Sequence, residues 1–233
     1  MFAEYIFPPH SVVALPIKKY QLTMPIHRIF CVGRNYLAHA NEMGSSVDKA
    51  TQEPFYFLKH PSHYAPSGST IPYPSRTQNL HHEMELAVII GKEGANIPVE
   101  AAKHYIFGYA CALDMTRRDL QAQMKERRLS WDIAKDFENG AIISEVVPIA
   151  ECGELTSGKI ELSVNGEVKQ SSDLAQMIWS VDEIIAHLST LYTLMPGDVI
   201  MTGTPEGVGA VVAGDELTGH IDGIGDITLK IGE

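Results

Sequence analysis

The apolar residues of the chain fall mostly into short runs that either alternate with polar residues or continue for a few positions. Runs of this kind, bounded by glycine, proline and asparagine, are typical of β-strands. Asn165-Gly166 lies between two of them, which predicts a hairpin with a tight turn. The expected strands cover residues 27–32, 55–58, 83–90, 106–113, 159–164, 167–170 and 199–202.

Helices are expected in only a few places. Residues 180–192 begin with a Ser-Val-Asp-Glu capping box, and residues 118–128 also have a helical composition. Residues 40–53 are small and polar, which predicts a short helix or a mobile loop, and the prolines and glycines of 64–75 predict a loop. Strands and long helices do not alternate, so we expect an α+β fold dominated by β-strands rather than a doubly wound sheet.

Two segments are expected along the chain. Four prolines interrupt residues 1–26, so this part is expected to form an N-terminal extension that packs along a surface. Residues 27–233 contain no internal repeat and no low-complexity linker. Their length suits one domain with a substantial core.

Composition and charge exclude several classes of protein. The formal net charge of −11 argues against binding to nucleic acid or to an anionic membrane surface, because both need a basic footprint. No apolar run reaches the ~18 residues of a membrane span. Three widely spaced cysteines indicate neither a disulfide framework nor a zinc site. The N-terminus lacks the basic region of a signal peptide, so we expect a cytoplasmic protein.

Two carboxylates stand close together in the segment HHEME at 81–85. Because alternate residues of a strand face the same way, Glu83 and Glu85 share one face and Met84 lies on the other. Adjacent carboxylates repel unless a cation or a proton lies between them, and oxygen ligands suit Mg²⁺, Mn²⁺ or Ca²⁺. A solvated edge strand is the simpler alternative. The spacing excludes the HExxH helix of zinc enzymes.

Other candidate groups have weaker patterns. Asp114 ends an apolar run and is either a helix N-cap or a third oxygen ligand. His39 and Glu42 have the spacing that joins side chains on a helical turn, where a carboxylate fixes the tautomer of an imidazole, although a surface pair has the same spacing. Lys59 and Lys135 lie inside or beside apolar runs, where most lysines extend their ammonium to solvent.

A glycine-rich segment, TGTPEGVG, covers residues 202–209. It lacks the spacing of a P-loop or of a dinucleotide-binding turn. A loop that brings backbone N–H groups and the Thr204 hydroxyl close to a ligand remains consistent with it.

Taken together, the chain resembles the fumarylacetoacetate hydrolase family. The matching segments follow the family's order between about residues 28 and 230 and include CVGRNYLAH, FLK, HHEMELAVIIGK, GYACALDMTRRDLQ, WDIAKDF, LSVNGEVKQ and PGDVIMTGTPEGVG. The resemblance implies a β-roll of twisted mixed sheets, a homodimer, and Mg²⁺ or Mn²⁺ held by Glu83, Glu85 and Asp114. It implies catalytic roles for His39, Glu42 and Lys135. It also implies substrate contacts from Arg34, Tyr36, Lys59, Arg118, Gln121 and Thr204.

The family resemblance also implies an activity on a small anionic keto acid. We expect hydrolysis of a C–C bond in an acylpyruvate, with fumarylpyruvate as the substrate, within the breakdown of aromatic compounds. Oxaloacetate decarboxylation or keto-acid isomerisation on the same metal site is the alternative. A carboxylate metal-binding protein without activity is a further alternative, although His39 and Glu42 are present.

Overall fold

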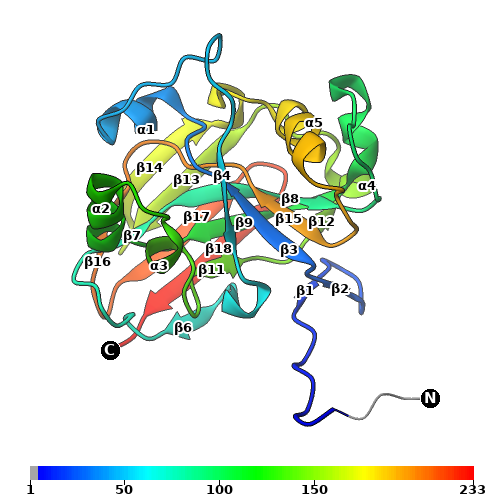
Figure 1. The fold of residues 1–233 in the computed structure, drawn as a ribbon. Helices are drawn as coiled ribbons and strands as arrows, with labels where there is room; N and C mark the ends of the chain where they lie inside the picture. Colours follow the sequence, from blue (N-terminus) through cyan, green and yellow to red (C-terminus); the bar gives the residue numbers. More distant parts are fainter. Residues whose placement is uncertain (1–4) are drawn as a thin grey trace.

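β-Strands dominate the computed structural model, which describes residues 5–233, and this confirms the expected fold class (Figure 1). The largest sheet is mixed and has eight strands. In spatial order they are β4 (Tyr56–Lys59), β3 (Arg28–Val32), β15 (Asp198–Met201), β8 (Met84–Ile90), β9 (Ile106–Asp114), β11 (Ala141–Ile143) and β5 (Tyr64–Pro66), and β12 (Val147–Pro148) also pairs with β9.

Three smaller sheets complete the architecture of residues 5–233. The five-stranded sheet contains, in order, β14 (Glu167–Asp173), β13 (Lys159–Val164), β17 (Glu216–Ile221), β18 (Gly225–Ile231) and β6 (Ser69–Ile71). The three-stranded sheet contains β10 (Thr116–Arg117), β7 (Leu80–His82) and β16 (Gly209–Val211). The two-stranded sheet pairs β1 (Ala14–Pro16) with β2 (Thr23–Pro25).

The helices are short and lie around the sheets. In Figure 1, α1, α2 and α3 lie on the left, and α4 and α5 lie on the right. The α-helices are α1 (Leu37–Glu42), α2 (Arg118–Arg127), α3 (Asp132–Lys135), α4 (Ile149–Cys152) and α5 (Val181–Leu191). The 3₁₀ helices are η1 (Pro61–His63), η2 (Val99–Tyr105) and η3 (Leu174–Gln176). The predicted capping box is present at α5, where Ser180 and Glu183 exchange hydrogen bonds with each other's backbone.

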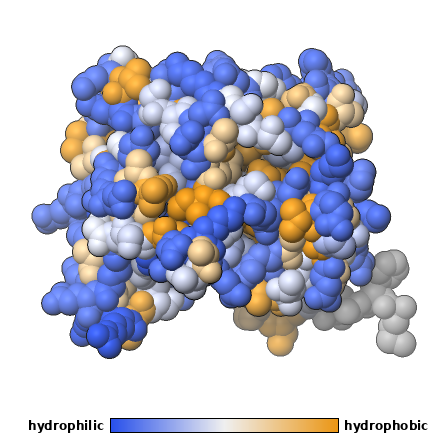
Figure 2. Space-filling model, turned by 90° about the horizontal axis from the view of Figure 1, so that it is seen from above, coloured by the Kyte–Doolittle hydropathy of each residue, from blue (hydrophilic) through white to orange (hydrophobic). Residues whose placement is uncertain are grey.

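The core has two parts, one on each face of the large sheet. Leu86 and Val88 of β8 pack with Leu162 of β13 in the cluster shared with the five-stranded sheet. Ala87 and Ile89, which alternate with them, pack in a second cluster on the opposite face. This is the period-two division expected of a strand that is buried on both faces. At the surface, apolar side chains gather near the middle of the face in Figure 2, surrounded by polar ones.

Two segments differ from the sequence-based expectation or extend it. Residues 64–75, expected as a loop, contribute β5 and β6, each of which pairs in parallel at the edge of a sheet. Such short edge strands gain their stability from a distant partner, so local composition does not mark them. The described part of the expected extension contains β1 and β2, and Leu15 is fully buried in the second cluster. Its first four residues lie outside the described part, and the domain division stays a prediction.

Among residues 5–233, no helix combines the length and the apolar character needed to cross a membrane.

Leu162 tests the core between the two large sheets, because its side chain is fully buried there. We expect Leu162→Ala to lower the free energy of unfolding by about 2–5 kcal/mol, through lost apolar burial and the cavity left behind. Urea unfolding followed by circular dichroism measures this change. Val212→Ala is the control, since Val212 is 61% exposed and its truncation should change stability little. Equal stability of L162A and the wild type would contradict this description of the core.

Candidate active site

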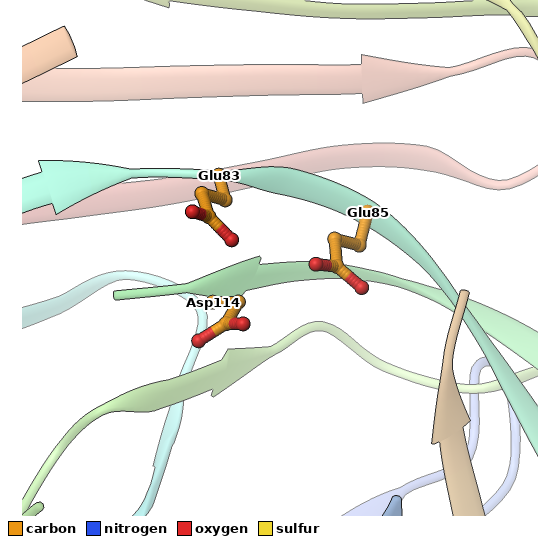
Figure 3. A group of neighbouring side chains, drawn as sticks. All are labelled: Glu83, Glu85 and Asp114. Atoms are coloured by element: carbon orange, nitrogen blue, oxygen red, sulfur yellow. The ribbon is translucent and has the colours of Figure 1, made fainter. Parts of the chain in front are cut away.

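Three carboxylates meet on one face of neighbouring strands at the end of the large sheet. Glu83 and Glu85 flank Met84, the first residue of β8, and Asp114 is the last residue of β9. The antiparallel register pairs Met84 with Leu113, and the N–H of Asp114 donates to the carbonyl of Glu83 at 2.9 Å. Glu83 and Glu85 therefore extend toward Asp114 (Figure 3). Carboxylate oxygens of the three lie within 4.8 Å of one another, and all three residues are buried.

Lys135 at the end of α3 connects two of these carboxylates. Its ammonium donates to Glu83 at 2.6 Å, to Asp114 at 2.7 Å and to the Thr116 hydroxyl at 2.8 Å. An ammonium has three donors, so the protein uses all of them. Burial would lower the pKa of Lys135, but the charges of Asp114 and Glu83 outweigh burial and raise it. Lys135 is therefore a fixed positive charge between the carboxylates.

Arg118 at the start of α2 holds Glu83 from another direction. Its guanidinium donates to a Glu83 oxygen at 2.5 Å and to the Gln121 side-chain oxygen at 2.6 Å. Burial would raise the pKa of Glu83, but the positive charges of Lys135 and Arg118 hold it far below its usual range. Glu83 is thus an ionised, buried carboxylate.

Glu85 has a different environment. Among the described residues no cation contacts its carboxylate, which accepts a hydrogen bond from the Gly203 N–H at 2.7 Å. Burial and the neighbouring charges of Asp114 and Glu83 raise the pKa of Glu85 well above its usual value. A buried carboxylate in this condition favours a bound cation. The triad offers the hard oxygen ligands that Mg²⁺ and Mn²⁺ prefer, so the residues present fit a divalent metal.

His39 and Glu42 are brought together by α1. The His39 Nδ1 lies 3.4 Å from a Glu42 oxygen, and both oxygens of Glu42 accept from the Gly207 N–H at 3.2 Å. Burial lowers the pKa of His39, although the charge of Glu83 and the hydrogen bond with Glu42 oppose this shift. His39 is therefore neutral near pH 7. With Nδ1–H directed to Glu42, its Nε2 is left as a proton acceptor.

The glycine-rich loop at 202–209 supports both groups through its backbone. The N–H of Gly203 binds Glu85, and the N–H of Gly207 binds Glu42. Gly207 has a φ of +87°, and a Cβ there would lie 2.0 Å from the carbonyl oxygen of Lys169. Only glycine allows this close approach to β14. The loop thus supports Glu85 of the triad and Glu42 through its backbone.

A narrow cleft opens beside the triad. Six of the predicted residues line it, namely Arg34, His39, Glu83, Arg118, Gln121 and Lys135. Arg34 lies with its guanidinium 5.4 Å from the Phe55 ring centroid and has no carboxylate partner among the described residues. Lys125 of α2 also lines the cleft without such a partner. Burial and the charges of Arg34 and Arg118 lower the pKa of Lys125. These unpaired cations suit an anionic ligand.

The remaining predicted residues lie outside the lining of the cleft. The Lys59 ammonium is fully buried and lies 2.8 Å from Asp114 without hydrogen-bond geometry, and it donates to the carbonyls of Met115 and Lys135. The predicted substrate contact of Lys59 stays a prediction, since in this structure its ammonium lies against Asp114 and these two carbonyls. Tyr36 has a buried hydroxyl with no partner among residues 5–233, and burial together with the charge of Glu85 raises its pKa. Thr204 accepts a hydrogen bond from Gln170 at 2.8 Å.

Sequence reasoning missed two residues of this region. Lys125 follows Arg118 and Gln121 at helical spacing, so the three side chains lie on one face of α2. This spacing could have identified Lys125 as a further candidate from the sequence. Gln170 is fully buried in β14, a strand whose other residues are half-buried or exposed. The sequence does not predict that this polar side chain is buried, because its burial depends on the elements that pack around β14.

Comparison with known proteins identifies relatives along most of the chain. Residues 28–231 match the family model described as Fumarylacetoacetate (FAA) hydrolase C-terminal. A fumarylpyruvate hydrolase from Ralstonia sp is 51% identical over 82% of this chain and 98% of that protein. The mitochondrial oxaloacetate tautomerase FAHD1 of Homo sapiens is 44% identical over 87% of this chain and 90% of that protein.

The solved structures show the same fold. The crystal structure of fumarylpyruvate hydrolase from Pseudomonas aeruginosa, in complex with Mn²⁺ and pyruvate, superposes with a TM-score of 0.94 at 45% identity. It covers 98% of this chain and 99% of its own. A putative fumarylpyruvate hydrolase from Burkholderia cenocepacia superposes with a TM-score of 0.92 at 37% identity, covering 100% of this chain and 96% of its own.

Glu85→Gln tests the metal site. Folding raises the pKa of Glu85 above the ~4.3 of a glutamate in the unfolded chain. The metal-free wild type therefore loses stability as the pH rises from about 4.3 to the pKa of Glu85 in the folded protein, and the loss is complete above that pKa. At pH 7 with chelator, we therefore expect E85Q to be at least as stable as the wild type. Mn²⁺ at about 100 times its Kd should stabilise the wild type by about 2.7 kcal/mol and E85Q much less.

Thermal unfolding with chelator and with Mn²⁺ measures both effects. Glu161→Gln is the matched control, since Glu161 lies on β13 in a surface pair with Lys159. Equal stabilisation of E85Q and the wild type by Mn²⁺ would remove Glu85 from the ligand set.

Proposed function

Because the chain belongs to the fumarylacetoacetate hydrolase family, we propose that it hydrolyses fumarylpyruvate to fumarate and pyruvate in a metal-dependent reaction. The observation that carries this proposal is His39, a neutral buried imidazole that lines the same cleft as Glu83 and is oriented by Glu42. Such a group is a general base for water. The relatives named fumarylpyruvate hydrolase, at 51% and 45% identity, support the choice of substrate.

Glu83, Glu85 and Asp114 would hold Mg²⁺ or Mn²⁺, and Mn²⁺ in the Pseudomonas aeruginosa structure supports this ligand chemistry. When bound, the divalent cation supplies Lewis acidity, which polarises a carbonyl and stabilises enolate charge. Lys135 and Arg118 hold Glu83 in place through charge-assisted hydrogen bonds. The positive charge of Lys135 also favours the negative charge that develops beside it.

The chemical step uses the His39–Glu42 dyad. Nε2 of His39 takes a proton from water, and the hydroxide oxygen adds to the carbonyl carbon of the fumaryl group. The bond from that carbon to the methylene carbon breaks, and its electron pair stays with the pyruvate part as an enolate. The His39 imidazolium returns its proton to the methylene carbon, which gives pyruvate. The new carboxylic acid of the other product loses its proton to solvent, so that fumarate and pyruvate leave and the dyad is restored. Glu42 stabilises the imidazolium while it exists.

The unpaired cations of the cleft favour a substrate with two carboxylates. Fumarylpyruvate carries one carboxylate beside its 2-keto group and one at the far end of the fumaryl group. Arg34 and Lys125 have no carboxylate partner among the described residues and line the cleft, so they are placed to bind the second carboxylate. In a chain with 29 acidic and 18 basic residues, such a local excess of positive charge indicates anion recognition.

Keto-acid isomerisation is the second candidate function. Oxaloacetate tautomerases from several organisms are 43–44% identical to this chain over 87–88% of its length. Moving a proton between carbon and oxygen of a keto acid needs the same base, His39, without attack by water. The expected decarboxylation and the inactive metal-binding alternative stay predictions. The expected homodimer stays a prediction, since the structure describes one chain.

His39→Gln tests the proposed base. We expect kcat/KM for fumarylpyruvate to fall by about 10²–10⁴-fold, because glutamine cannot accept a proton from water. Loss of the enol absorbance of fumarylpyruvate measures the rate, and stabilisation by Mn²⁺ shows whether the metal site is intact. Near wild-type turnover by H39Q with normal Mn²⁺ stabilisation would refute the scheme. If the wild type interconverts the enol and keto forms of oxaloacetate but leaves fumarylpyruvate intact, isomerisation replaces hydrolysis as the function.

Lys125→Met tests the binding of the second carboxylate. We expect KM for fumarylpyruvate to rise about tenfold, a modest factor because Lys125 is partly solvent-screened. KM for acetylpyruvate, which lacks the second carboxylate, should stay within about twofold. Lys230→Met is the matched control, because Lys230 pairs with Glu216 on the five-stranded sheet. An equal rise of KM for both substrates would contradict this role.

A further inference from the structure

Gln170 of β14 is a fully buried side chain whose amide is saturated with hydrogen bonds. Its Nε2 donates to the Thr204 hydroxyl at 2.8 Å and to the Pro205 carbonyl at 2.9 Å. Its Oε1 accepts from the Met84 N–H at 3.0 Å and lies 3.1 Å from Nδ1 of His82. A primary amide has two N–H donors and one oxygen with two lone pairs, so each is used.

The two backbone contacts fix which end of the amide faces which partner. The Met84 N–H can only donate, and the Pro205 carbonyl can only accept. The amide therefore cannot be reversed without breaking two hydrogen bonds of buried groups. It follows that Nε2, and not Oε1, faces the Thr204 hydroxyl. The Thr204 oxygen is an acceptor in this contact.

These hydrogen bonds join two parts of the active site. Met84 lies between Glu83 and Glu85 in sequence. Thr204 and Pro205 belong to the loop at 202–209, whose backbone binds Glu85 and Glu42. The loop also lies directly against β14 at Gly207, where a Cβ would be 2.0 Å from the Lys169 carbonyl oxygen. A single side chain thus ties the metal-ligand strand to the loop that supports the dyad.

The Thr204 hydroxyl also has a proton that needs a hydrogen-bond acceptor. Because its oxygen accepts from Gln170, the proton points away from Gln170. No protein group among residues 5–233 accepts a hydrogen bond from this hydroxyl, although Thr204 is only 3% exposed. A buried donor of this kind is costly unless a ligand or water supplies an acceptor.

We propose that Gln170 is a positioning residue that directs the Thr204 O–H to an oxygen of the bound keto acid. Thr204 is then a hydrogen-bond donor to a carboxylate or enolate oxygen, and it does not have to reorient when the ligand binds. This inference rests on the proposed function only for the ligand class, an anionic keto acid. It adds a residue that determines affinity without touching the ligand itself.

A double-mutant cycle with Gln170→Met and Thr204→Val tests the proposal. Methionine has a volume close to that of glutamine but cannot donate, and valine replaces the threonine hydroxyl by a methyl group. The probe is oxalate, a dianionic mimic of pyruvate enolate, titrated into Mn²⁺-loaded protein by calorimetry. We expect Thr204→Val to raise the Kd of oxalate about tenfold to a hundredfold, as for a lost hydrogen bond to a charged oxygen.

In the Gln170→Met background the same Thr204→Val change should have a clearly smaller effect, because the hydroxyl is no longer held in its donating direction. An equal factor in both backgrounds would show that Gln170 is merely structural, and the proposal would fail. An unchanged Kd in Thr204→Val alone would also overturn it. Thr204→Ser, which keeps the hydroxyl, should bind oxalate within about threefold of the wild type.

Two controls separate this proposal from loss of fold and from failure of the proposed reaction. Ser189→Ala removes a buried hydroxyl that bonds Ile97 and Ala186 in the α5 region, so it should lower the melting temperature without changing the Kd of oxalate. The melting temperature of Gln170→Met, read beside it, shows whether that variant is folded. If the wild type does not hydrolyse fumarylpyruvate but the coupling on oxalate is present, the proposed function fails and this inference stands.

Discussion

The repulsion between three buried carboxylates is the constraint on which the rest of the site depends. Glu83, Glu85 and Asp114 face one another on two paired strands, out of reach of bulk water. Burying a negative charge there is unfavourable in free energy unless an opposite charge or a hydrogen bond lies beside it. Lys59, Lys135 and Arg118 supply opposite charges to Glu83 and Asp114, while Glu85 depends on one backbone N–H. The arrangement is therefore adapted to a cation.

The positive charges near the cleft divide into two groups by what they contact. The first group holds the carboxylates of the triad: Lys135 donates to Glu83 and Asp114, and the Lys59 ammonium forms an ion pair with Asp114. The second group, Arg34 and Lys125, has no carboxylate partner among the described residues. The division separates groups that build the site from groups that are available to a substrate. An acidic protein can bind an anion in this way, because the field in a cleft is set by its nearest charges.

Backbone N–H groups hold the carboxylates of Glu85 and Glu42 in position. The loop at 202–209 gives one N–H to Glu85 and another to Glu42, so a single segment supports the carboxylate triad and the His39–Glu42 pair. Gly207 permits the loop to lie against β14, and Gln170 fastens it there. The triad, the His39–Glu42 pair and the loop are therefore joined by direct contacts. A displacement of β14 would shift all three. This connection links β14 to the triad, although β14 contributes no carboxylate to it.

The sequence by itself determined the strand pattern, the β-dominated class, the capping box of α5 and the shared face of Glu83 and Glu85. These properties follow from period-two alternation and from local hydrogen bonds, which the chain encodes over a few residues. Tertiary structure decided what depends on register and on distant partners. The pairing of β8 with β9 made Asp114 a member of the triad rather than an N-cap. The pairing of β4 with β3 put the Lys59 ammonium 2.8 Å from Asp114. The parallel partners of β5 and β6 turned an expected loop into edge strands. The contacts of Gln170 with residues distant in sequence were likewise decided by the tertiary structure. Contacts of both kinds leave no periodic pattern in the sequence from which they could be predicted.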